Sequence, residues 1–114
     1  METKRQERIS KLIQKDLGEI FQLEVAHLTP GVMVTVTKVH VTPDLSLARV
    51  YLSLFPTKDK EELIKKINTA GKEIRGLLGR RIRHQVRSIP ELRFYLDDSL
   101  DYIERIDELL KNDY

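Results

Sequence analysis

The 114-residue chain has no cysteine and no tryptophan, and none of its apolar runs is long. The missing cysteine excludes disulfides, thiolate metal sites and cysteine nucleophiles. No apolar run approaches the roughly 20 residues that span a bilayer, and the N-terminal stretch METKRQERIS lacks the apolar region of a signal peptide. We therefore expect a single soluble domain, residues 1–114, in the cytoplasm, built around one hydrophobic core.

The charged residues of the chain are unevenly distributed. From Lys72 to Arg93, seven basic residues stand against two acidic ones, a formal charge of +5, whereas the whole chain carries only +2. Residues 94–114 carry a formal −5. Clustering of this kind, more than net charge, is typical of proteins that bind polyanions.

An amphipathic helix is predicted from about Thr3 to Glu24, because apolar residues recur there at steps of three and four. Basic residues lie off this apolar stripe. They form either an ordinary solvated helix face or a second contact with the same polyanion, and the sequence leaves both alternatives open. These residues are Lys4, Arg5, Arg8, Lys11 and Lys15.

Three strands are predicted from β-branched residues and alternation. In residues 32–41 the valines change phase near Thr37 and Lys38, which indicates a β-bulge or a strand apolar on both faces. The turn-forming residues Thr42-Pro43-Asp44 then lead into a regularly alternating strand over residues 48–54, so that the two strands form a hairpin. A third short strand is predicted over residues 92–96, after Pro90.

The helical stripe over residues 63–82 contains glycines at 71, 76 and 79. Glycine weakens a helix and permits a kink, so we expect two helices meeting at an angle, the first capped by Thr57 or Asp59. The motif Gly76-Leu77-Leu78-Gly79 matches a nucleotide-clamping GxxG loop, but its leucines continue the apolar stripe and predict packed helix. A last surface helix is expected over residues 98–114, capped by Asp97-Asp98-Ser99.

The expected order, α-β-β-α-kink-α-β with an additional C-terminal helix, predicts an α+β fold with a three-stranded sheet covered by helices. This order matches the type II KH arrangement, an RNA-binding architecture. We expect the cationic stretch to contact RNA phosphates, with help from the first helix. The predicted RNA-binding residues are Lys72, Arg75, Arg80, Arg81, Arg83, Arg87, Lys4, Arg5 and Arg8.

The stretch SIPELRFYLDDSLDYIERIDELL, residues 88–110, resembles the ribosome-binding factor A family, in which a Pro-Glu-Leu-x-Phe strand runs into an Asp-x-Ser-Leu helix start. Arg80-Arg81-Ile82-Arg83 and Thr42-Pro43-Asp44-Leu45 agree with the family in order and spacing. The resemblance implies a type II KH-like fold in which an Ala-x-Gly kink replaces the GxxG loop. The corresponding residues here are Ala70-Gly71-Lys72, where the glycine is displaced by one position and Lys72 stands where glycine is usual.

The resemblance also implies a function without catalysis. A protein of this family would bind the free 30S ribosomal subunit as a monomer and assist late maturation and processing of 16S ribosomal RNA near its 5′ end. It would use no cofactor, metal, membrane or small-molecule substrate. Cold adaptation is linked to the family, and an assembly GTPase would be a further partner.

Two other functions fit parts of the sequence. A protein-interaction module could dock through the exposed side of the second strand and the acidic C-terminal helix. A magnesium-dependent nuclease could use Asp97, Asp98 and Asp101, although helix capping accounts for the same residues. The three histidines, His27, His40 and His84, lack the spacing of a metal site.

Overall fold

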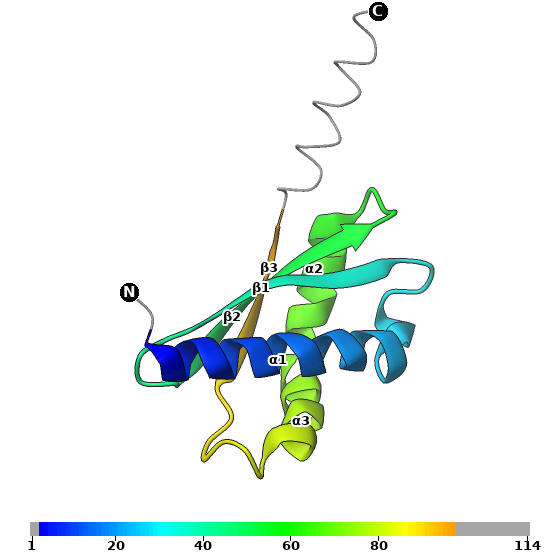
Figure 1. Cartoon of the computed structure of the whole chain (residues 1–114). Helices are drawn as coiled ribbons and strands as arrows, with labels where there is room; N and C mark the ends of the chain where they lie inside the picture. The colour runs from blue at the N-terminus through cyan, green and yellow to red at the C-terminus, as the bar shows by residue number, and fades with distance from the viewer. Residues whose placement is uncertain (1–2, 98–114) are drawn as a thin grey trace, which may run out of the picture.

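The computed structural model describes residues 3–97, and Figure 1 shows how its helices and strands are arranged. The predicted element order is confirmed through the third strand, whereas the helix predicted over residues 98–114 lies outside the described residues. No helix within residues 3–97 is long and apolar enough to cross a membrane. The elements are α1 (Lys4–Leu23), a 3-10 turn η1 (Ala26–Leu28), β1 (Met33–Val41), β2 (Leu47–Phe55), α2 (Lys60–Thr69), α3 (Gly71–Ile82) and β3 (Glu91–Leu96).

The sheet has the strand order β1-β2-β3, with β1 antiparallel and β3 parallel to β2. The predicted bulge is confirmed, because Val36 pairs with Leu52 and Lys38 pairs with Tyr51, which leaves Thr37 without a partner in the register. The extra residue switches the phase of β1. Valines before and after it consequently face the same core.

One face of the sheet is covered by helices. In Figure 1, α1 crosses the direction of α2 and α3, and these helices share a single core with the sheet. Alternate residues of β2 and β3 are buried against them, as the predicted alternation requires. Phe94 is buried in this core and packs edge-on against Phe21 of α1 with ring centroids 5.8 Å apart. The opposite face of the sheet carries exposed side chains and no described helix.

The first turn of α1 is fixed by two side chains. Thr3 and Gln6 form a capping box, in which the Thr3 hydroxyl accepts from the Gln6 N–H at 3.1 Å and Gln6 Oε1 accepts from the Thr3 N–H at 2.9 Å. Gln6 Nε2 also donates to the Val41 carbonyl at 2.9 Å. The start of α1 is therefore held against the end of β1, which places Arg5 and Arg8 near the β1–β2 turn.

The predicted pair of helices is confirmed, with the break at Ala70, whose ψ of 10° departs from helical geometry. Gly71 opens α3 without a positive φ, and α3 continues unbroken through Gly76 and Gly79. The GxxG motif is thus packed helix, as expected, with Leu78 fully buried.

Of the two alternatives predicted for the cap of α2, the one that uses Asp59 is wrong. Asp59 occupies the N-cap position, but its side chain makes no capping hydrogen bond. The Thr57 hydroxyl instead accepts from the Asp59 N–H at 3.1 Å, and the backbone of Asp59 is not extended as a capping residue requires.

Candidate nucleic-acid interface

The predicted basic residues separate into groups with different surroundings. Lys72 and Arg80 lie two helical steps of four apart on α3, so they share one exposed face, and Arg83 follows at its end. All three side chains are exposed, and none forms an ion pair with a residue in the range 3–97. This stripe is available for an external anion.

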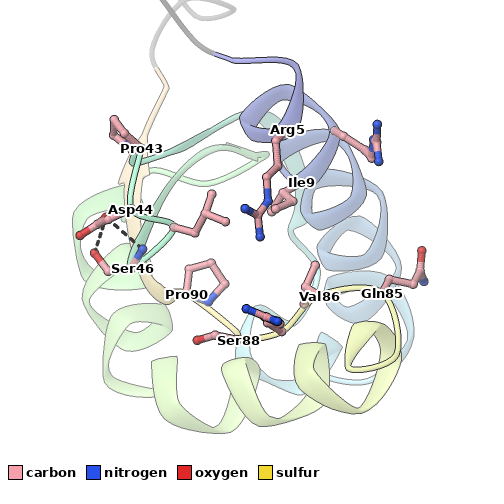
Figure 2. Close-up of a pocket in the computed structure, with 12 residues that line it drawn as sticks. Arg5, Ile9, Pro43, Asp44, Ser46, Gln85, Val86, Ser88 and Pro90 are labelled. Carbon is pink, nitrogen blue, oxygen red and sulfur yellow. Dashed lines mark hydrogen bonds between the residues drawn. The ribbon is translucent and has the colours of Figure 1, made fainter.

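A second group lines a hollow of about 650 Å³ between the start of α1, the β1–β2 turn and the loop from α3 to β3. Arg5 and Arg8 reach it from α1, and Arg87 reaches it from the loop. Figure 2 shows Arg5 directed toward the space between Pro90 and Val86. The fold thus brings together cationic side chains from opposite ends of the described chain.

The β1–β2 turn forms a rigid wall of this hollow. The Asp44 carboxylate accepts hydrogen bonds from the Thr42 hydroxyl at 2.7 Å, the Ser46 hydroxyl at 2.8 Å and the Ser46 N–H at 3.2 Å. These bonds, that from Thr42 first, lower the pKa of Asp44 below its ordinary value. Leu45 completes the turn at a φ of 61°. Because Asp44 is anionic, a bound phosphate would lie toward the arginines and away from this wall.

A neighbouring hollow of about 790 Å³ lies at the junction of α2 and α3, and Gly71, Lys72 and Arg75 line it. Ser46 and Ser88 line both hollows, so the two adjoin. Gly71 and Lys72 of the predicted kink therefore line a hollow that adjoins the first one. Ala70, the third residue of the kink, is half-buried between the two helices.

Arg75 has a structural contact within the chain. Its guanidinium donates to the Ile89 carbonyl at 2.6 Å and to the Pro90 carbonyl at 3.1 Å. These bonds fasten α3 to the segment that enters β3. The side chain is exposed, but these hydrogen bonds hold its guanidinium group in one position.

Arg81 is occupied by ion pairs with α1. Its guanidinium contacts Asp16 at 3.4 Å and Glu24 at 3.3 Å, and Glu19 makes a shorter contact. The hydrogen bond to Glu19 is the main cause of a raised pKa for Arg81. With its side chain 26% exposed, Arg81 joins α3 to α1 and lines neither hollow.

Lys4 is exposed in the first turn of α1 and lines neither hollow. No group of three or more potential metal ligands occurs within residues 3–97. Asp97, considered above for a nuclease, accepts a hydrogen bond from the Thr37 hydroxyl. Asp98 and Asp101 lie outside the described residues.

Comparison with protein families identifies the chain. The family model described as ribosome-binding factor A matches residues 5–110. The chain belongs to the ribosome-binding factor A family. Among curated proteins, the ribosome-binding factor A of Christiangramia forsetii is 46% identical over 111 residues, covering 96% of this chain and 85% of that protein. That of Flavobacterium johnsoniae is 47% identical with the same coverage of both chains.

Solved structures of ribosome-binding factor A share the fold. The crystal structure from Thermus thermophilus has a TM-score of 0.66 at 24% identity and covers 80% of this chain and 94% of its own. The solution structure of a putative ribosome-binding factor A from Thermotoga maritima has a TM-score of 0.61 at 27% identity, with 83% and 89% covered. The α+β fold with a three-stranded sheet is thus that of ribosome-binding factor A.

A homology model of the Thermus thermophilus ribosome-binding factor A has been fitted into a cryo-EM map of its complex with the 30S subunit. It is 26% identical to this chain, with a TM-score of 0.62 over 78% of this chain and 91% of its own.

Sequence reasoning missed one cationic group of the chain. Lys38, Arg49 and Arg93 lie on the face of the sheet away from the helices, where Tyr51 stacks on Tyr95. The alternation of each strand showed which residues point outward, but the pairing of β2 with β3 is not visible in the sequence.

Proposed function

We propose that the protein binds the free 30S ribosomal subunit and assists late maturation and processing of 16S ribosomal RNA near its 5′ end, without making or breaking covalent bonds. Family membership supports this proposal, and so does the Thermus thermophilus relative fitted into a map of a 30S complex. We also propose that its architecture is type II KH-like, with Ala70-Gly71-Lys72 in place of the GxxG loop.

The convergence of Arg5, Arg8 and Arg87 on one hollow carries the proposal. None of the three forms an ion pair with another residue between positions 3 and 97. A guanidinium group presents paired donors that match the oxygens of a phosphate. Three such groups around one hollow favour a phosphate-rich ligand, and the exposed stripe of α3 extends the same charge.

The proposed recognition depends on phosphates and RNA shape. Arg5, Arg8 and Arg87 would bind backbone phosphates at the hollow, and the α3 stripe of Lys72, Arg80 and Arg83 would bind others, with Lys4 at the margin. Arg75 and Arg81 have a different part in this proposal, because they are held by carbonyls and carboxylates of the protein itself. They maintain the face on which the other side chains are presented.

The resemblance supports three further parts of the proposal. The protein would act in the cytoplasm as a monomer, it would matter most for growth at low temperature, and an assembly GTPase would be a further partner.

Co-sedimentation with salt-washed 30S subunits tests the proposal, with 50S subunits and mature 70S ribosomes as comparisons. The variant Arg5→Gln/Arg8→Gln/Arg87→Gln should bind more weakly and reduce the slope of log K against log salt by about 2 to 3, since each phosphate contact contributes about 0.7 to 0.9. The matched control removes three exposed charges elsewhere, as Lys58→Gln/Lys65→Gln/Lys66→Gln. The proposal fails if both variants bind the subunit equally well.

A further inference from the structure

Two tyrosines stack on the face of the sheet that the helices leave uncovered. Tyr51 of β2 and Tyr95 of β3 are direct partners in the parallel register. Their ring centroids are 5.6 Å apart and their planes differ by 29°, which is a stacked arrangement. Tyr95 lies on an edge strand and is 38% exposed.

Cationic side chains surround this pair on the same face. Arg49 and Arg93 are partners in the same register, two residues before the tyrosines on their strands, and Lys38 of β1 lies opposite Tyr51. All three are exposed, and within residues 3–97 none forms an ion pair. Two acids flank this face, Glu91 at the start of β3 and Asp97 just after its end, and Asp97 accepts a hydrogen bond from Thr37.

Sheet stability alone does not explain why stacked tyrosines and exposed cations lie together on one face. A cross-strand aromatic pair stabilises a sheet wherever it occurs, but that role does not account for three exposed cations beside it that form no ion pair with another described residue. Aromatic rings bind the faces of unpaired bases with little dependence on sequence, and neighbouring cations bind the connecting phosphates. RNA-binding sheets use the same pairing of exposed aromatic and basic side chains.

We propose that this uncovered face binds single-stranded RNA, with an unpaired base stacked on Tyr95 so that it continues the Tyr51–Tyr95 stack. Arg49 and Arg93 bind the adjoining phosphates, and Lys38 binds on the side of Tyr51. This inference rests on the proposed function in that RNA is the ligand, but it uses a face of the sheet away from the hollow of Arg5, Arg8 and Arg87. It would give the protein a second contact, made with unpaired bases.

The test uses the full chain and a fluorescein-labelled oligoadenylate of about ten nucleotides, long enough to occupy one site. Binding is followed by fluorescence anisotropy at fixed salt. Tyr95→Leu should weaken binding about fivefold to a hundredfold, the range for loss of one stacked base. Tyr95→Phe is the matched control, since it keeps the ring, and should bind as the wild type does. Thermal unfolding of both variants checks that the fold is retained.

A photochemical readout gives an independent answer. An oligonucleotide carrying 5-bromouridine should cross-link to Tyr95 on irradiation, as located by fragment-ion sequencing, and Arg49→Gln/Arg93→Gln should reduce the yield. The inference is overturned if the wild type does not bind the oligonucleotides, or if Tyr95→Leu binds them as well as Tyr95→Phe does. It is also overturned if Tyr95→Leu loses binding to the 30S subunit but still binds the oligonucleotide as the wild type does, because the face would then contact a protein.

The two proposals can fail separately. Co-sedimentation of the Arg5/Arg8/Arg87 variant reports on the hollow, whereas oligonucleotide binding by the Tyr95 pair of variants reports on the sheet. If the first variant still binds the 30S subunit and Tyr95→Leu loses the oligonucleotide, the hollow is excluded and the sheet face is retained.

Discussion

The side chain of Asn68 exchanges two hydrogen bonds with the backbone of Phe94. Asn68 Nδ2 donates to the Phe94 carbonyl and Asn68 Oδ1 accepts from the Phe94 N–H, both at 2.9 Å. These backbone groups lie on the outer edge of β3, away from β2. An amide side chain of α2 thus takes the place of a fourth strand at this point.

Replacing Asn68 with Ala should lower the free energy of unfolding by about 1 to 2 kcal/mol, because two hydrogen bonds are lost. Amide hydrogen exchange at Phe94 should become faster, whereas exchange within α1 should change only by the global effect. Asn68→Asp is the informative control, since it can still accept from the N–H but cannot donate to the carbonyl. Unchanged exchange at Phe94 in the Ala variant would contradict the assignment.

Arg81 should matter for stability more than its neighbour Arg80. Arg81→Gln breaks the contacts to Asp16, Glu19 and Glu24 and should cost about 1 kcal/mol, a value kept small because the site is partly solvated. Arg80→Gln removes the same charge from an exposed position and should leave stability unchanged.

Arg81→Gln should also weaken RNA binding indirectly, since it leaves three carboxylates without their arginine partner, two on α1 and one at its C-cap. Equal stabilities of the two glutamine variants would show that the ion pairs contribute nothing. A double-mutant cycle with Glu19→Gln measures the contribution of the Arg81–Glu19 pair.

Gly76 should be replaceable by alanine with a gain in stability. A Cβ at this position in α3 would meet nothing within 4 Å, and alanine is favoured over glycine inside a helix by about 1 kcal/mol. Gly31 is the contrasting position, because its φ of 74° disfavours any side chain by about 1 to 2 kcal/mol. The midpoint temperature of thermal unfolding should rise for Gly76→Ala and fall for Gly31→Ala. A lower midpoint for both variants would contradict the placement of Gly76 on an open face of α3.

The Asp44 carboxyl should titrate below its ordinary pKa of 3.8. Since folding lowers this pKa, the contribution of Asp44 to stability is present above pH 3.8 and is lost as the pH falls through the lower, folded value. An NMR titration of the carboxyl carbon gives the pKa directly. Ser46→Ala should move the midpoint back toward 3.8, and a midpoint unaffected by this substitution would argue against the turn network.

Much of the fold could be predicted from periodicity. The valine phase change located the bulge at Thr37, the three-to-four spacing located α1, and Gly71 was one of three glycines that predicted a break in the second helical stretch. The cap by Asp59 was predicted wrongly, because a suitable residue type does not fix the backbone conformation that would direct its side chain to the first turn. Local sequence constrains which residues face outward, but not which segments meet.

The candidate site could also be predicted only in part, because its residues come from distant segments. The charge cluster around α3 was visible in the sequence, yet the meeting of Arg5 with Arg87 depends on how α1 crosses the sheet. The engagement of Arg75 by carbonyls and of Arg81 by acids likewise depends on contacts between distant segments. The Tyr51–Tyr95 stack required the parallel pairing of β2 with β3, which no local pattern encodes.

The bulge at Thr37 links the register of β1 to the number of residues in the strand. With strictly regular pairing, a strand of this sequence would place either its earlier or its later valines against α1 and turn the others toward water. Removing Thr37 would leave Val34, Val36, Val39 and Val41 in strict alternation, so a regular strand would keep all four valines against the core. Deleting Thr37 should therefore cost little beyond its hydrogen bonds to Tyr51 and Asp97, whereas inserting a further residue into β1 would turn the valines beyond it outward.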